Sequence, residues 1–204
     1  MRPDFRNALF EGGEEAHAQD LGVTAANARR LKPGTEYDRL IPSPDFKSDH
    51  IKWFPKLDDT LDGMKQIVRN TLGHTAKLAP ALKGGTLEAT CNNIWHWVYQ
   101  HIQYKPDRPF REELRSPARL WAERKTGGDC DCYSITIGSI LANLGIPFSF
   151  RVARYYEDKG FQHVYVVVPS KEARRGYFII DPVMDEPDAE KTILEKKDFP
   201  MQLV

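Results

Sequence analysis

The sequence is poor in cysteine, has no excess charge of either sign and contains no long apolar run. Its three cysteines among 204 residues are an odd number, which argues against a disulfide framework and favours a reducing compartment. Lysine plus arginine and aspartate plus glutamate both number 29, so the net charge indicates neither a nucleic acid nor a membrane as partner. No apolar stretch is long enough to span a bilayer, and the first residues lack the apolar core of a signal peptide. We therefore expect a cytoplasmic protein without a transmembrane segment.

Recognisable metal and cofactor motifs are missing as well. The chain has no calcium-binding loop, and no second ligand pair at zinc-site spacing accompanies Cys130 and Cys132. These two thiols could bind a metal together with His163, and that alternative stays open. The prediction from sequence is a protein with no metal and no cofactor.

The length of the chain suits one domain with an appended arm. Residues 1–50 are poor in large apolar side chains and rich in glycine, proline and charge, and only Thr24–Leu31 looks helical. We expect this segment to be an extended arm on the domain of residues 51–204, or to be partly disordered until a partner binds it. It could also cover a cleft in that domain.

Two helices are predicted in the first half of the domain. Thr60 is placed to cap a helix that runs to about Leu78, and Thr86 to cap the next one. The second helix is expected to carry His96 and His101 on its outer flank. Its inward stripe consists of apolar residues at helical spacing: Cys91, Ile94, Trp95, Val98 and Ile102.

The second half alternates between loop, helix and strand patterns. Residues 106–115 are expected to form a charged loop, and Ser116-Pro117 is a strong start for a short helix. Period-two patterns and valine-rich runs predict three strands after Pro147, around residues 148–153, 162–168 and 177–181. The charged tail from residue 185 is expected to dock through Phe199, Met201 and Leu203.

Between these halves, Gly127-Gly128 ends one element and Asp129 stands where a helix cap belongs. Apolar residues then recur at helical spacing up to Gly145, which predicts a helix with one buried face. Cys130 therefore falls in the first helical turn. Unpaired backbone N–H groups and the helix dipole at that position favour a thiolate, the nucleophilic form of cysteine.

A histidine and an aspartate are predicted to meet on the sheet. If strands 162–168 and 177–181 pair as antiparallel neighbours around a symmetric loop centred near Glu172, His163 lies opposite Asp181. A register shift by one residue would place the two on opposite faces. A thiolate with an adjoining His–carboxylate pair is the machinery of cysteine acyl transfer. Cys130 would attack a carbonyl, His163 would move the proton and Asp181 would orient the imidazole. The N–H of Cys130 is a candidate oxyanion donor.

The same residues carry a family resemblance. The segments Gly-Asp-Cys-Asp-Cys-Tyr-Ser, Leu-Ala-Asn-Leu-Gly-Ile-Pro, Gln-His-Val-Tyr-Val and Ile-Ile-Asp-Pro occur in that order, and the chain over residues 86–183 resembles the transglutaminase-like superfamily, which is related to papain-type cysteine proteases. The resemblance implies an α+β fold in which a cysteine-bearing helix packs on an antiparallel sheet. It also implies Cys130, His163 and Asp181 as a catalytic triad that acts on a protein or peptide.

Several alternatives remain at this stage. Many members of the superfamily carry an acidic residue two positions after the nucleophile, and here Cys132 stands there. Cys132 could be the nucleophile itself, a packing residue or a resolving thiol. The expected reaction is hydrolysis of, or acyl transfer from, an amide or isopeptide bond. Deamidation of protein side chains by the same triad is a second reading, and a catalytically degenerate binding or assembly module is the third.

Overall fold

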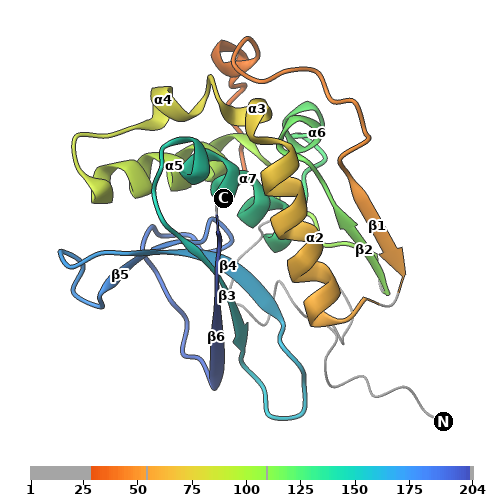
Figure 1. Ribbon diagram of the computed structural model, residues 1–204, viewed down its shortest axis with the longest axis vertical. Helices are drawn as coiled ribbons and strands as arrows, with labels where there is room; N and C mark the ends of the chain where they lie inside the picture. Colours follow the sequence, from red (N-terminus) through yellow and green to blue (C-terminus); the bar gives the residue numbers. More distant parts are fainter. Residues whose placement is uncertain (1–28, 54, 109, 203–204) are drawn as a thin grey trace.

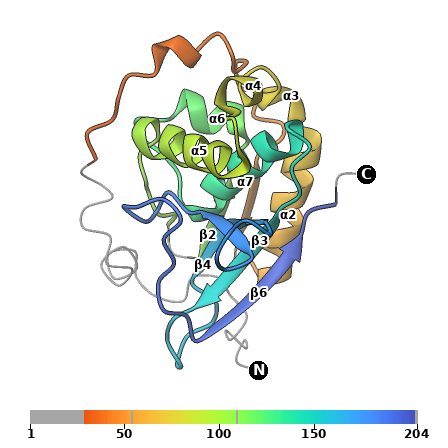
Figure 2. The ribbon, with the colours of Figure 1, turned by 90° about the vertical axis from the view of Figure 1, so that its left-hand side faces the viewer.

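The structure, a computed structural model, describes residues 29–53, 55–108 and 110–202. One layer is a four-stranded antiparallel sheet in the order β5-β4-β3-β6, and the helices gather on one of its faces (Figures 1 and 2). The strands of this sheet are β3 (Ser149–Arg154), β4 (His163–Pro169), β5 (Tyr177–Ile180) and β6 (Glu195–Pro200). The predicted α+β class with an antiparallel sheet is confirmed.

The three predicted strands form as expected, and β4 lies inside the sheet rather than at its edge. Strand β6 lies in the charged tail, for which no strand was predicted. It pairs with β3 along its length, and Asp198 accepts two hydrogen bonds from Arg151 at 2.6 and 2.7 Å. Five of the six residues of β6 are charged or prolyl, so the sequence shows no strand pattern there, and the pairing is supplied by β3. Met201 is buried as expected, whereas Leu203 lies outside the described residues.

Helix α7 (Cys130–Asn143) is the central element of the fold. Every residue from Cys130 to Leu141 is buried, so the predicted single buried face is wrong. The helix contacts α2, α3 and α6 as well as strand β4, which leaves it no solvent-facing side over those residues. It ends as predicted: Gly145 has φ 68°, and the N–H of Ile146 donates to the carbonyl of Leu141 at 3.0 Å.

The predicted helix from Thr60 to Leu78 is divided in the structure. Helix α2 (Leu57–Asn70) is followed by two single turns, α3 (Leu72–Thr75) and α4 (Ala79–Leu82). The cap of helix α2 is Lys56, four residues before the predicted Thr60, and the Asp59 carboxylate accepts a hydrogen bond from the N–H of Lys56 at 3.0 Å. The Thr60 hydroxyl instead donates to the buried carboxylate of Glu112 at 3.0 Å.

Helix α5 (Leu87–His101) begins after Thr86, whose hydroxyl accepts a hydrogen bond from the N–H of Ala89 at 3.0 Å, as predicted. Its five inward residues are buried and His96 is exposed. His101, however, is buried rather than on an outer flank. It lies under the segment that contains η3 (Thr35–Tyr37), with its Nδ1 3.1 Å from the carbonyl of Lys32.

The predicted loop of residues 106–115 contains a strand. Strand β2 (Arg111–Leu114) pairs antiparallel with β1 (His50–Trp53), far away in the sequence, so a local pattern could not reveal either strand. Helix α6 (Pro117–Ala122) follows with proline at its first position, as predicted. Residues 29–31 of the expected helix Thr24–Leu31 are not helical, and the rest of that helix lies outside the described residues. Within the described part of the chain, none of the helices has the length and apolar character needed to traverse a membrane.

Candidate active site

The start of helix α7 is fixed by the turn that precedes it. Gly127 has φ 90°, and a Cβ at this position would lie 1.8 Å from the carbonyl oxygen of Gln103. Gly128 forms a bridge with Tyr104, and its carbonyl accepts a hydrogen bond from Lys105 at 2.9 Å. Only glycine fits so close to the neighbouring backbone at position 127, and a Cβ at Gly128 would lie 2.8 Å from side-chain atoms of Leu120 and Cys132, which together explain the Gly-Gly pair. The turn delivers Cys130 to the first helical position.

His163 and Asp181 are brought together as predicted. His163 Nε2 lies 2.7 Å from Asp181 Oδ2, and both side chains are buried. The register differs from the expected one, because Val166 faces Ile180 and the loop is centred on Ala173. Asp181 is therefore displaced by two residues from the position opposite His163. An even displacement keeps both side chains on the same face of the sheet, so the contact survives.

The other ring nitrogen of His163 has no hydrogen-bond partner within the described part of the chain. This Nδ1 atom is buried, and the ring is flanked by Tyr165, whose ring centroid lies 5.3 Å away. A buried imidazole with one nitrogen on a carboxylate and the other without a partner is set up to exchange a proton at the second nitrogen. The arrangement is the one that a general base needs.

Cys130 lies next to this pair, at the same end of strand β4. The Ser134 hydroxyl joins the two elements, since it is 2.7 Å from the carbonyl of Cys130 and 3.3 Å from that of Val164. The thiol of Cys130 also forms a hydrogen bond with the backbone of Val164, the residue after His163. The structure shows no hydrogen bond between the described side chains of Cys130 and His163. Cys130 is therefore hydrogen-bonded to the residue next to His163, without a hydrogen bond to the imidazole itself.

The expected thiolate bias of Cys130 is contradicted by its surroundings. Burial, followed by the charge of Asp129, raises the pKa of the Cys130 thiol well above its usual value, and the hydrogen bond with Val164 opposes this only in part. The residue is 1% exposed. Desolvation of the charged form therefore outweighs the helix dipole at this position. These surroundings favour the neutral thiol of Cys130 over the thiolate.

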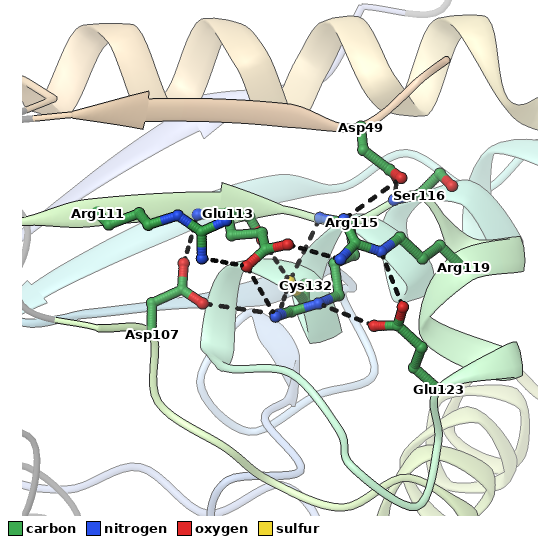
Figure 3. Close-up of polar contacts among 9 residues, drawn as sticks. All are labelled: Asp49, Asp107, Arg111, Glu113, Arg115, Ser116, Arg119, Glu123 and Cys132. Atoms are coloured by element: carbon green, nitrogen blue, oxygen red, sulfur yellow. Dashed lines mark hydrogen bonds and ion pairs between the residues drawn. The ribbon is translucent and has the colours of Figure 1, made fainter. Parts of the chain in front are cut away.

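Cys132 faces the opposite side of α7 and is fully buried among polar groups of β2 and α6 (Figure 3). Its sulfur accepts hydrogen bonds from the N–H of Arg115 at 3.4 Å and from the Arg115 guanidinium at 3.6 Å. The same sulfur lies 3.4 Å from the carbonyl of Glu113, to which its S–H donates. Ion pairs of Glu113, Arg115 and Arg119 surround this contact. Cys132 thus joins α7 to the β2–α6 corner, away from His163.

Buried carboxyl groups crowd the same end of α7. The ligand atoms of Asp129, Asp131 and Cys132 lie within 4.8 Å of one another, and so do those of Asp107, Glu112 and Asp129. Burial raises the pKa of Asp107 to about 9 and that of Glu112 to about 7. Within the described residues, the two clusters of three side chains named above are the ones that could hold a metal ion. Sequence reasoning missed them because their spacing matches no metal motif.

The chain after Asp181 is held by residues that sequence reasoning did not single out. Trp95 Nε1 donates to the carbonyl of Asp181 at 2.9 Å, and the N–H of Val183 donates to Asp181 Oδ1 at 3.2 Å. The phenol of Tyr155 lies near the site as well, because both Asp181 and Cys130 add to the effect of burial in raising the pKa of Tyr155. Trp95 and Tyr155 are far from Asp181 in the sequence, so no local sequence pattern could have shown their positions.

Comparisons with known proteins add a distant likeness. No protein-family model and no curated protein matches the chain. Among solved structures, Legionella pneumophila LapG has a TM-score of 0.43 at 15% identity over 62% of this chain and 75% of that chain. The EGTA-treated form of the same protein gives 0.43 at 15% over 62% and 73%, and its calcium-bound form gives 0.42 at 14% over 62% and 75%. A likeness this distant carries no functional argument, so function is argued below from the site.

Proposed function

We propose that this protein is a cysteine-dependent enzyme that cleaves or transfers an amide or isopeptide bond of a protein or peptide through an acyl-thioester on Cys130. The observation that carries the proposal is the buried His163–Asp181 pair, 2.7 Å apart, whose second imidazole nitrogen has no partner among the described residues. A histidine oriented in this way beside a helix-terminal thiol is the arrangement of nucleophilic catalysis.

The chemistry follows from the positions of the three side chains. Cys130 transfers its thiol proton to Nδ1 of His163, and its sulfur attacks the carbonyl carbon of the substrate. Asp181 holds Nε2 and stabilises the imidazolium that forms. The first-turn N–H of Cys130 has no partner within its helix and is available to the oxyanion. The imidazolium then protonates the leaving amine, which leaves the acyl group on the sulfur.

Burial of both groups adds a requirement. His163 is 0% and Cys130 is 1% exposed, so a substrate can reach the sulfur only after side chains over the site rearrange. The same movement would admit water or an amine as the acyl acceptor. Water makes the protein a protease, an amidase or a deamidase, and an amine makes it a transglutaminase.

Alkylation mapped to individual cysteines tests the proposal. With excess iodoacetamide at pH 7, we expect Cys130 to react faster than Cys91 and Cys132, because His163 can accept its proton. Cys91 is a suitable internal control, since burial raises its pKa to about 12. The His163→Ala variant should lose the excess reactivity of Cys130. Equal rates for Cys130 in the parent protein and in this variant would contradict the proposal.

The products of a protein mixture then identify the reaction. Cleaved peptides, a cross-link to an added primary amine, and a gain of one mass unit at glutamine or asparagine are three different outcomes in a mass spectrum. Each should be absent with Cys130→Ala.

One observation favours a second function. The Cys130 thiol forms no hydrogen bond with His163 and its pKa is raised by burial, which is the condition expected of a catalytically degenerate protein that binds a partner. In that case Cys130 should react no faster than Cys91, and no covalent product should form.

A further inference from the structure

We infer that Arg29 is a positioning residue, which holds the turn after Asp181 and thereby fixes the carboxylate against His163. The expected effect of Arg29 on activity rests on the proposed function. Its expected effect on the His163–Asp181 hydrogen bond rests only on the contacts that Arg29 makes. Arg29 lies more than 150 residues from the turn in the sequence, in the segment predicted as an arm.

The guanidinium of Arg29 binds the backbone directly after Asp181. Its two terminal nitrogens donate to consecutive carbonyls, to Pro182 at 2.7 Å and to Val183 at 3.0 Å. The side chain is 7% exposed, and its nearest carboxylate, Asp185, lies 3.7 Å away. A buried guanidinium that uses its fork on two adjacent carbonyls fixes their orientation as well as their position.

Aromatic rings complete the clamp on the side of helix α5. The Arg29 guanidinium lies 3.8 Å above the ring of Tyr99, which stacks on Trp95 at 4.5 Å. Trp95 in turn donates to the carbonyl of Asp181 at 2.9 Å. The carbonyls of three consecutive residues, from Asp181 to Val183, are therefore each held by Arg29 or Trp95.

This clamp acts on the carboxylate through the backbone. The N–H of Val183 donates to Asp181 Oδ1 at 3.2 Å, while Oδ2 faces His163 at 2.7 Å. The Pro182 carbonyl and the Val183 N–H belong to one planar peptide group, so loss of the Arg29 hydrogen bond to this carbonyl frees the group whose N–H orients the carboxylate. Misplacement of a reacting group by about 1 Å can lower a rate roughly 100-fold. We expect a smaller effect here, because Trp95 and Val183 still hold part of the turn.

The test compares Arg29→Ala with Arg30→Ala, a matched change at the neighbouring exposed arginine. The readouts are the alkylation rate of Cys130 as a function of pH and the NMR signal of the His163 Nε2–H proton. For Arg29→Ala we expect a roughly 10-fold lower rate at pH 7. The pH of half-maximal reactivity should fall, because a displaced Asp181 stabilises the imidazolium less and the neutral imidazole that accepts the thiol proton then forms at lower pH. Arg29→Lys, which keeps the charge but not the fork, should recover part of the rate.

The NMR signal separates failure of this inference from failure of the proposed function. We expect the His163 Nε2–H proton to exchange faster with solvent in Arg29→Ala than in Arg30→Ala, whether or not the protein is catalytic. Equal exchange in the two variants would overturn the role of Arg29 and leave the proposed function intact. Reactivity of Cys130 that does not depend on His163 would overturn the proposed function alone. If Arg29→Ala does not fold, Asp185→Asn can replace it, because this change removes the half-exposed carboxylate that lies 3.7 Å from the Arg29 guanidinium. We then expect the His163 Nε2–H proton to exchange with solvent about twofold to threefold faster than in the parent protein.

Discussion

The two sides of the proposed site differ in how far they are prepared for catalysis. On the side of the sheet, His163 and Asp181 are already hydrogen-bonded at 2.7 Å, and the turn beyond Asp181 is clamped by Arg29 and Trp95. On the side of the helix, Cys130 is a protonated thiol beside buried carboxyl groups that oppose its ionisation. The proposed general base is already oriented, whereas the proposed nucleophile depends on a change in its surroundings.

The two cysteines at the start of α7 sharpen this contrast. Cys132 is surrounded by arginine and backbone groups on the β2–α6 side, whereas Cys130 lies against strand β4 next to His163. They are two residues apart and so project from the helix in different directions. The difference gives Cys132 a packing role and is the reason that Cys130 is the proposed nucleophile.

The largest expected effect is a difference in activity between Cys130→Ala and Cys132→Ala. We expect Cys130→Ala to abolish acyl-enzyme formation without loss of the fold, because the thiol is the nucleophile. Cys132→Ala should keep at least a substantial part of the activity. Turnover of an identified substrate with each purified variant checks this. Retained turnover in Cys130→Ala, or its loss in a folded Cys132→Ala, would reverse the assignment.

The next effect concerns the prepared side of the site. Asp181→Asn should lower kcat by roughly 10³-fold, because the amide no longer stabilises the imidazolium and can hold the wrong tautomer of His163. KM should change little if Asp181 does not touch the substrate. Steady-state kinetics at pH 7 measure both constants. An unchanged kcat would show that the His163–Asp181 pair is structural.

The buried carboxyl groups near Cys130 should make the free energy of unfolding depend on pH. Burial raises the pKa of Glu112 from 4.5 to about 7, so the folded state binds more protons than the unfolded state between these values. The free energy of unfolding should therefore fall as the pH rises from about 4.5 to 7, and Glu112→Gln should lack this part of the decrease. In metal-free buffer, the stability of Glu112→Gln minus that of the parent protein should therefore be about 3 kcal/mol larger at pH 8 than at pH 4.

Urea unfolding of both proteins across this pH range provides the measurement. Glu112→Gln can keep an oxygen acceptor for Thr60, so the comparison isolates the charge. Parallel pH profiles for the two proteins would mean that Glu112 does not titrate in this range.

The smallest expected effect is the contribution of Cys132 to stability. Cys132→Ala leaves a small cavity and removes the sulfur that Arg115 contacts, so it should lower the free energy of unfolding by about 1–2 kcal/mol. Cys132→Ser has nearly the same volume and serves as the matched control. The free energy of unfolding of both variants can be obtained from thermal unfolding. A value for Cys132→Ala equal to that of the parent protein would contradict the packing role.

The sequence predicted the parts of the fold that depend on local patterns. The helix between Asp129 and Gly145 and the three strands after Pro147 follow from apolar periodicity and glycine positions. The meeting of His163 and Asp181 was also predictable, although through a register that is shifted by two residues. Side-chain alternation made the prediction tolerant of an even shift and would have made it fail for an odd one.

The remaining features depend on contacts between distant segments. Strands β1 and β2 stabilise each other across some 60 residues, and the charged strand β6 exists because β3 pairs with it. The pKa of Cys130 was predicted in the wrong direction because its helix position is visible in the sequence, whereas its burial next to Asp129 is not. The clamp of Arg29 on the Asp181 turn was invisible for the same reason.

Transfer of a proton from Cys130 to His163 is the central claim, and acid-quenched mass spectrometry with an activated acetyl ester tests it most directly. The account predicts that an acetyl group appears on Cys130 in the parent protein and that His163→Ala slows its appearance strongly. Acetylation of Cys132 in place of Cys130, or equal rates in the parent protein and the variant, would contradict the account.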